Sequence, residues 1–91
     1  MPNNAYELPI GNKGPQEVIV ASSTVLGRAI REQRRHLGLK QLDLAGLGGT
    51  GNRFIVDLEN GKPTVQLQKA LDILALLGLE VVVRPRTTGA P

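Results

Sequence analysis

The chain has 91 residues, enough for one small domain with one core, and its formal net charge is +3 at neutral pH. It contains no Cys, so disulfides and thiolate metal sites are excluded, which agrees with a reducing cytoplasm. With one Phe, one Tyr and no Trp, the core must be built from aliphatic side chains. The first residues lack the pattern of a signal peptide, and the longest apolar run, 73–79, is too short to span a membrane. We therefore expect a cytoplasmic protein without a membrane partner.

Positive charge is concentrated in residues 28–40, where Glu32 is the single acid. The basic residues there are Arg28, Arg31, Arg34, Arg35 and Lys40. Residues 64–83 instead hold one basic residue and two acids. A basic cluster of this kind is typical of a nucleic-acid-binding surface, although a solvated helix face has the same composition.

The first part of the chain predicts an arm followed by a helix. Residues 1–17 are rich in Pro, Asn and Gly without an apolar period, which favours a flexible arm. The β-branched residues 18–21 predict a strand or an extended segment. The hydroxyl residues 22–24 offer an N-cap for a helix over about 23–37, which Gly38 ends in the left-handed conformation. The residues at helical spacing are Leu26, Ile30, Gln33 and Leu37.

Two short helices are predicted next, with a glycine cluster between them. The first begins at Lys40 and continues to Ala45. The second covers 52–59, places Ile55 and Leu58 on one face, and ends at Asn60-Gly61. The side chains on its opposite, outward face are Asn52, Arg53, Val56 and Asp57.

A fourth helix and one strand complete the predicted domain, which covers 18–84. Thr64 is the expected cap of the helix, and Gly78 closes it. Its apolar stripe is Val65, Ala70, Leu71, Leu74 and Leu77. The β-branched run 79–84 predicts a strand, which must pair with residues 18–21 or with a second copy of the chain. Pairing with a copy gives a two-fold homodimer through Leu79, Val81, Val82 and Val83. Residues 85–91 are expected to be a frayed tail.

The spacing Gly46-x-Gly48-x-x-Gly51 matches the dinucleotide-binding fingerprint in letters. That fingerprint requires a strand directly before it and an acid about 20 residues further on, at the end of the next strand. Here the preceding residues are helical in pattern, and the acid at that distance, Asp72, lies within the fourth predicted helix. We therefore reject a nucleotide site and interpret the segment as a helix-turn-helix.

Residues 26–61 resemble the Xre/Cro-type helix-turn-helix module. The matching elements are an Arg-rich first helix, Gly38-Leu39-x-Gln41-x-x-Leu44-Ala45, and Leu58-Glu59-Asn60-Gly61. The stretch 53–64, followed by a Leu-rich helix and a β-branched end, resembles the HipB-like antitoxin branch, whose partner is a HipA-type kinase toxin. The resemblance implies an all-α, lambda-repressor-like domain of four to five helices, with a short C-terminal β-strand that pairs across a homodimer.

The resemblance also implies roles for individual residues. Arg34 and Glu59 match a buried ion pair between the first and third helices. Asn52 and Arg53 match base-reading positions, and we expect Val56 and Asp57, on the same outward face, to read bases with them. The residues expected to contact phosphates are Lys40, Gln41, Gly51, Asn60 and Lys62. The chain departs from the family in three places: Lys40 replaces a capping Ser or Thr, glycines crowd the end of the second helix, and Thr50 replaces a larger apolar residue.

We therefore expect a DNA-binding repressor that recognises a palindromic operator in double-stranded DNA as a homodimer and serves as the antitoxin of a kinase toxin. The alternatives are an autonomous Xre-type regulator without a toxin and a protein-interaction module that does not bind DNA. We expect no enzymatic activity, because no nucleophile–base–acid set is visible. We also expect no cofactor and no metal, since His36 is the only histidine and no carboxylate cluster accompanies it.

Overall fold

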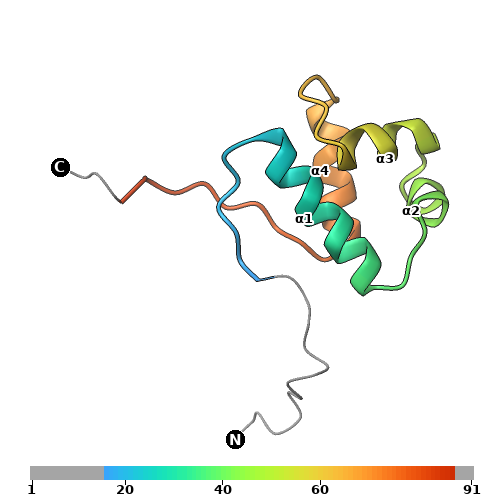
Figure 1. Ribbon diagram of the computed structural model, residues 1–91, viewed down its shortest axis with the longest axis horizontal. Helices are drawn as coiled ribbons and strands as arrows, with labels where there is room; N and C mark the ends of the chain where they lie inside the picture. The colour runs from blue at the N-terminus through green and yellow to red at the C-terminus, as the bar shows by residue number, and fades with distance from the viewer. Residues whose placement is uncertain (1–15, 88–91) are drawn as a thin grey trace, which may run out of the picture.

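Four helices form the body of the protein in the computed structural model, which describes residues 16–87 (Figure 1). They are α1 (Ser23–His36), α2 (Gln41–Gly48), α3 (Asn52–Glu59) and α4 (Leu67–Leu76). The expected all-α fold is confirmed, with four helices in the described range. None of these helices is long and apolar enough to cross a membrane. The predicted arm lies outside the described residues except for positions 16 and 17, and so do the last four residues of the predicted tail.

Helix α1 begins and ends where the sequence predicts. The hydroxyl of Ser22 accepts the backbone N–H of Val25 at 3.2 Å, which caps the start of the helix. Gly38 follows the helix with φ of +75°, a conformation that glycine adopts without strain. The side-chain Nε2 atom of Gln33 donates to the backbone carbonyl of Leu77 at 2.8 Å, which joins α1 to the end of α4. The expected apolar stripe is wrong at Leu37, which is exposed because the chain has already left the helix there.

Helix α2 is longer than predicted, because Gly46 and Gly48 remain helical. A Cβ on Gly48 would come within 2.6 Å of the Cδ1 atom of Ile73 on α4, so glycine permits the close approach of the two helices. Gly49, with φ of +66°, then ends α2. At the other end, the carboxylate of Asp43 accepts the backbone N–H of Lys40 at 2.8 Å.

The core lies between the four helices and is aliphatic, as the composition requires. Its largest fully buried side chains are Ile30, Leu44, Ile55, Ile73 and Leu77. Phe54 packs against this core from α3 and is half-buried, with the ammonium of Lys69 lying 5.7 Å from the centre of its ring. The predicted cap of α4 at Thr64 is wrong. The N-cap is Gln66, because residues 63–65 form a turn before the helix begins.

No strand is present between residues 16 and 87, so the predicted strand over 79–84 is not supported. The N–H of Leu79 donates to the carbonyl of Leu74 at 2.9 Å, and its side chain packs against the core. Leu79 therefore belongs to the end of α4 rather than to a free strand. The apolar side chains of residues 18–20 and 81–83 are all exposed, and both segments leave the same side of the helical body (Figure 1). A strand requires a backbone partner, and residues 16–87 of a single copy provide none for either segment.

The close contact of α1 with α3 predicts opposite effects for two glycine substitutions. A Cβ on Gly27 would lie 2.5 Å from the carbonyl oxygens of Leu58 and Glu59, whereas one on Gly46 would meet no atom within 4 Å. We expect Gly27→Ala to lower the free energy of unfolding by about 1–3 kcal/mol, because α1 and α3 must separate. Gly46→Ala, within a helix, is expected to raise it by about 0.5–1 kcal/mol. Urea unfolding measures both changes, and equal effects would contradict the close contact.

Candidate nucleic-acid interface

The glycine cluster joins two helices and does not follow a strand in the described structure. Gly46 and Gly48 lie within α2, Gly49 ends it, and Gly51 is the N-cap of α3. This arrangement is a helix-turn-helix, and it lacks the strand on which a dinucleotide fingerprint depends. The N-cap residues of the two helices, Lys40 and Gly51, have no side chain that accepts the first helical N–H groups. In α2 the carboxylate of Asp43 accepts only the N–H of Lys40 itself, so N–H groups at both helix starts remain available to an anion.

Helix α3 presents Arg53 outward. Its side chain is 86 % exposed, while Ile55 and Leu58 on the other face are buried in the core. Val56 and Asp57 are half-buried at the edge of the exposed face. The structure therefore places Arg53 furthest into solvent among the four expected base-reading residues.

Asn52, which the sequence predicts on the outward face of α3, has its side-chain oxygen turned into the protein. It is half-buried at the start of α3, and its Oδ1 atom is buried without a hydrogen-bond partner. An asparagine that reads adenine needs both amide atoms, because it accepts from one group of the base and donates to another. In this conformation the oxygen of Asn52 does not reach the surface, so a two-bond adenine contact requires its amide to rotate outward.

A buried ion pair joins the end of α3 to α1. The Nε atom of Arg34 donates to Oε2 of Glu59 at 2.6 Å, and Nη2 donates to Oε1 at 3.0 Å. The Arg34 side chain is 8 % exposed and the Glu59 side chain 1 %, so both charges are removed from water. Nη1 of Arg34 also donates to the carbonyl of Leu39 at 2.8 Å. Losing one partner of such a pair costs about 3–5 kcal/mol, because the other charge is left buried and unpaired.

Gln41 reaches the same carboxylate from α2. Its Nε2 atom donates to Oε1 of Glu59 at 3.0 Å, and the residue is half-buried. The sequence predicts a phosphate contact for Gln41, whereas the structure shows its amide turned toward Glu59. An amide NH₂ carries two hydrogens, so the contact with Glu59 orients the group and leaves one donor for another acceptor.

Arg31 is a candidate interface residue that the sequence reasoning did not select. Its Nε atom lies 3.9 Å from Oε1 of Glu59, and its side chain is 45 % exposed. Glu59 thus faces two guanidinium groups, those of Arg31 and Arg34, so one positive charge remains uncompensated at this point. The signal that would have identified it is the spacing: Arg31 precedes Arg34 by three residues on the same helix.

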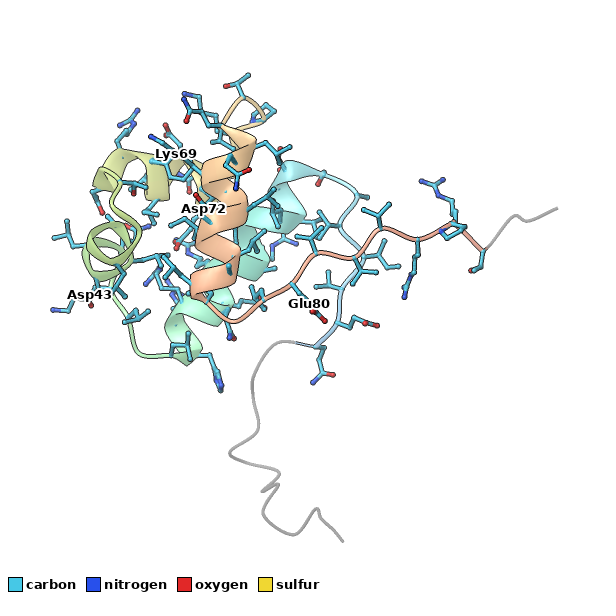
Figure 2. The ribbon with its side chains drawn as sticks, turned by 180° about the vertical axis from the view of Figure 1, so that it is seen from behind. Asp43, Lys69, Asp72 and Glu80 are labelled. Atoms are coloured by element: carbon cyan, nitrogen blue, oxygen red, sulfur yellow. The ribbon has the colours of Figure 1, made fainter. Side chains whose placement is uncertain are left out.

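The remaining expected phosphate contacts are exposed at the ends of α2 and α3. Lys40 and Gly51 stand at the two helix starts, and Asn60 and Lys62 follow α3. The acids Asp43, Asp72 and Glu80 lie on α2, α4 and the C-terminal segment (Figure 2). α1, which carries the four arginines of the basic cluster, faces the viewer in Figure 1, and α4 does so in the reverse view of Figure 2. The part of the chain that the structure describes contains no cluster of potential metal ligands, and His36 is exposed at the end of α1.

Two comparisons with known proteins agree with this geometry. A helix-turn-helix family model matches residues 30–83, which include α2, the turn and α3. The uncharacterized HTH-type transcriptional regulator y4mF of Sinorhizobium fredii is 48 % identical over 56 residues, which cover 62 % of this chain and 74 % of that protein. The residues matched by the family model, 30–83, contain the buried pair of Arg34 with Glu59 and the outward face of α3. The chain therefore belongs to the helix-turn-helix family.

Proposed function

We propose that the protein is a sequence-specific DNA-binding transcriptional repressor whose helix α3 enters the major groove. The observation that carries the proposal is the outward position of Arg53 at the start of α3, the second helix of the helix-turn-helix. The similarity to a protein named as an HTH-type transcriptional regulator supports the same function. The proposal includes no catalysis and no cofactor.

The proposed contacts are of two kinds: contacts to DNA bases, which give sequence specificity, and contacts to phosphates, which do not. Arg53 offers its terminal guanidinium nitrogens to O6 and N7 of guanine, and Val56 offers a methyl group to thymine. The free N–H groups at the starts of α2 and α3 take phosphates, together with exposed side chains around them. Those side chains are Arg31, Lys40, Gln41, Asn60 and Lys62. The buried pair of Arg34 with Glu59 keeps α1 and α3 at a fixed relative position, so the two groups of contacts meet DNA together.

Binding to duplex DNA should fall steeply with salt, because phosphate contacts release counterions. Three of the proposed phosphate contacts in each subunit are cations, Arg31, Lys40 and Lys62, so log K should fall with log salt at a slope of about −2.7 per subunit. Fluorescence anisotropy with random-sequence duplexes from 50 to 200 mM salt measures that slope. A protein-interaction module would show weak binding that changes little with salt, and that result would refute DNA binding.

Two truncations distinguish a contact that recognises a base from a contact that binds a phosphate. Arg53→Ala is expected to cost about 1–3 kcal/mol on the preferred site and to relax the preference at one base position. Gln41→Ala is expected to weaken binding to all sequences alike. Selection from a randomised duplex library identifies the preferred site, and circular dichroism checks that each variant keeps its helices. Unchanged site preference and affinity in Arg53→Ala would show that Arg53 does not read a base.

We infer that the functional form is a homodimer in which residues 80–84 of two copies pair as antiparallel strands, without Leu79, which is held at the end of α4. The exposed Val81, Val82 and Val83 support this, since Val83 is 94 % exposed and a second copy would supply the missing backbone partner. A two-fold dimer suits a palindromic operator, whose half-sites typically lie about one helical turn of DNA apart.

Strand pairing predicts that proline in the segment prevents dimer formation. Successive N–H groups of a strand point to opposite sides, so the double variant Val81→Pro, Val82→Pro removes a ladder donor in either register. Neither N–H has a partner among the described backbone hydrogen bonds, so the monomer should stay folded. Sedimentation equilibrium should show a monomer for this variant and a dimer for Arg86→Pro, Thr87→Pro. Dimers in both variants would contradict the pairing.

We further propose that the repressor is the antitoxin of a HipA-type kinase toxin and represses its own operon. The resemblance of residues 53–64, with the Leu-rich helix after them, to the HipB-like branch supports this role. The protein should co-purify with the product of the gene adjacent to its own, as a complex of constant stoichiometry. If that product is not kinase-like, or if no complex forms, the protein is an autonomous regulator.

A further inference from the structure

One carboxylate lies between two cations at the outer edge of α3. Oδ1 of Asp57 is 3.3 Å from Nε of Arg53, and its Oδ2 is 3.6 Å from Nζ of Lys62. Arg53 lies one helical turn before Asp57, and Lys62 follows in the loop after α3, where its backbone N–H donates to the Asp57 carbonyl at 3.0 Å. Arg53, which is proposed to contact a base, and Lys62, which is proposed to contact a phosphate, therefore both pair with Asp57.

Burial distinguishes the three partners. The side chain of Asp57 is 21 % exposed, whereas those of Arg53 and Lys62 are 86 % and 53 % exposed. Ion pairs with cations as exposed as these contribute little to stability, because water screens them. The carboxylate is thus the anchored partner and the cations are the free ones. A side chain so largely covered is also poorly placed to accept a hydrogen bond from a base itself.

The contact with Asp57 constrains how Arg53 can meet DNA. The carboxylate meets the guanidinium through Nε. A guanidinium is planar, so a partner at Nε restrains the plane and leaves the two terminal nitrogens free. A fork of two N–H groups is what the O6 and N7 atoms of guanine accept. An Arg53 held in this way loses less side-chain freedom on binding a base than an unrestrained arginine would.

The charge of Asp57 acts in the opposite direction on phosphates. A carboxylate beside Lys62 competes with DNA for that ammonium and repels the phosphate backbone. This penalty applies to every DNA sequence. The gain from an oriented Arg53 applies only where a guanine is in reach.

We propose, on the basis of the DNA-binding function proposed above, that Asp57 is a positioning residue that orients Arg53 and weakens binding to non-specific DNA. Asp57 raises the ratio of specific to non-specific affinity without contacting a base. This role replaces the base contact that the sequence predicts for Asp57.

The test compares Asp57→Asn with a matched charge change elsewhere. Asp72 lies on the outer side of α4, where its carboxylate accepts a hydrogen bond from Gln68 at 2.9 Å, so Asp72→Asn is the control (Figure 2). The probes are the duplex that the wild-type chain selects from a randomised library and a random-sequence duplex. Each variant is titrated with both at several salt concentrations. Arg53→Ala and the double variant Asp57→Asn, Arg53→Ala complete a double-mutant cycle.

We expect Asp57→Asn to bind the random duplex about threefold more tightly near 0.1 M salt and to steepen the salt slope by up to about 0.9, because Lys62 no longer divides its charge between Asp57 and a phosphate. The ratio of the affinity for the selected duplex to the affinity for the random duplex should fall about fivefold or more. A fivefold fall corresponds to about the lower end of the discrimination that one bidentate base contact provides. In the Arg53→Ala background, the substitution at position 57 should no longer change that ratio, although the gain on random DNA should persist. The Nε–H resonance of Arg53 in the free protein should shift in Asp57→Asn and stay in place in Asp72→Asn.

Several results would overturn the inference. One is equal behaviour of Asp57→Asn and Asp72→Asn toward both duplexes. Another is a loss of specificity at position 57 that persists without the Arg53 side chain, which would make Asp57 a base reader. A fall in the melting temperature of Asp57→Asn that accounts for weaker binding to both duplexes would make its role structural. These outcomes differ from failure of the proposed function, in which the wild-type chain itself binds neither duplex or prefers no sequence.

Discussion

The carboxylate of Glu59 is the point on which the geometry of this domain depends. It accepts hydrogen bonds from Arg34 on α1 and from Gln41 on α2, while it belongs to the last residue of α3. A charge this deeply buried is tolerated only when its partners are complete, so the three helices must keep the relative positions that bring those partners together. With the end of α3 held in this way and Ile55 and Leu58 in the core, Arg53 has to point away from the body.

At two positions a glycine allows helices to pack closely. Gly27 brings α1 against the last carbonyl groups of α3, and Gly48 brings α2 against Ile73 on α4. In a domain whose core has few aromatic side chains, close approach of helices is a way to bring small aliphatic groups into contact. The letters of a nucleotide-binding fingerprint thus arise here from helix packing and from one turn, and they have no relation to phosphate binding through a βα unit.

The proposed interface combines attraction that does not depend on sequence with selection that does. In the proposed function, the N–H groups at the starts of α2 and α3 and the basic side chains from α1 to the loop after α3 would attract the backbone of DNA. That attraction alone would hold the protein on any duplex. Arg53, oriented by a covered carboxylate that also engages Lys62, adds a contact available only at a matching base. A regulator needs the ratio of these two affinities, and one acid acts on both.

The sequence by itself determined the elements with strong local signals and the family to which they belong. Ser22 before α1, Gly38 after it, and Ile55 with Leu58 on one face of α3 act through neighbouring residues, so their outcomes could be predicted. Tertiary contacts decided the rest. Gly48 is the last residue of α2 and lies against the side chain of Ile73, and Leu79 packs on the core just after α4 ends. The inward amides of Gln41 and Asn52 and the ion pairs of Asp57 depend on groups that meet only after folding, and no pattern along the chain encodes those distances.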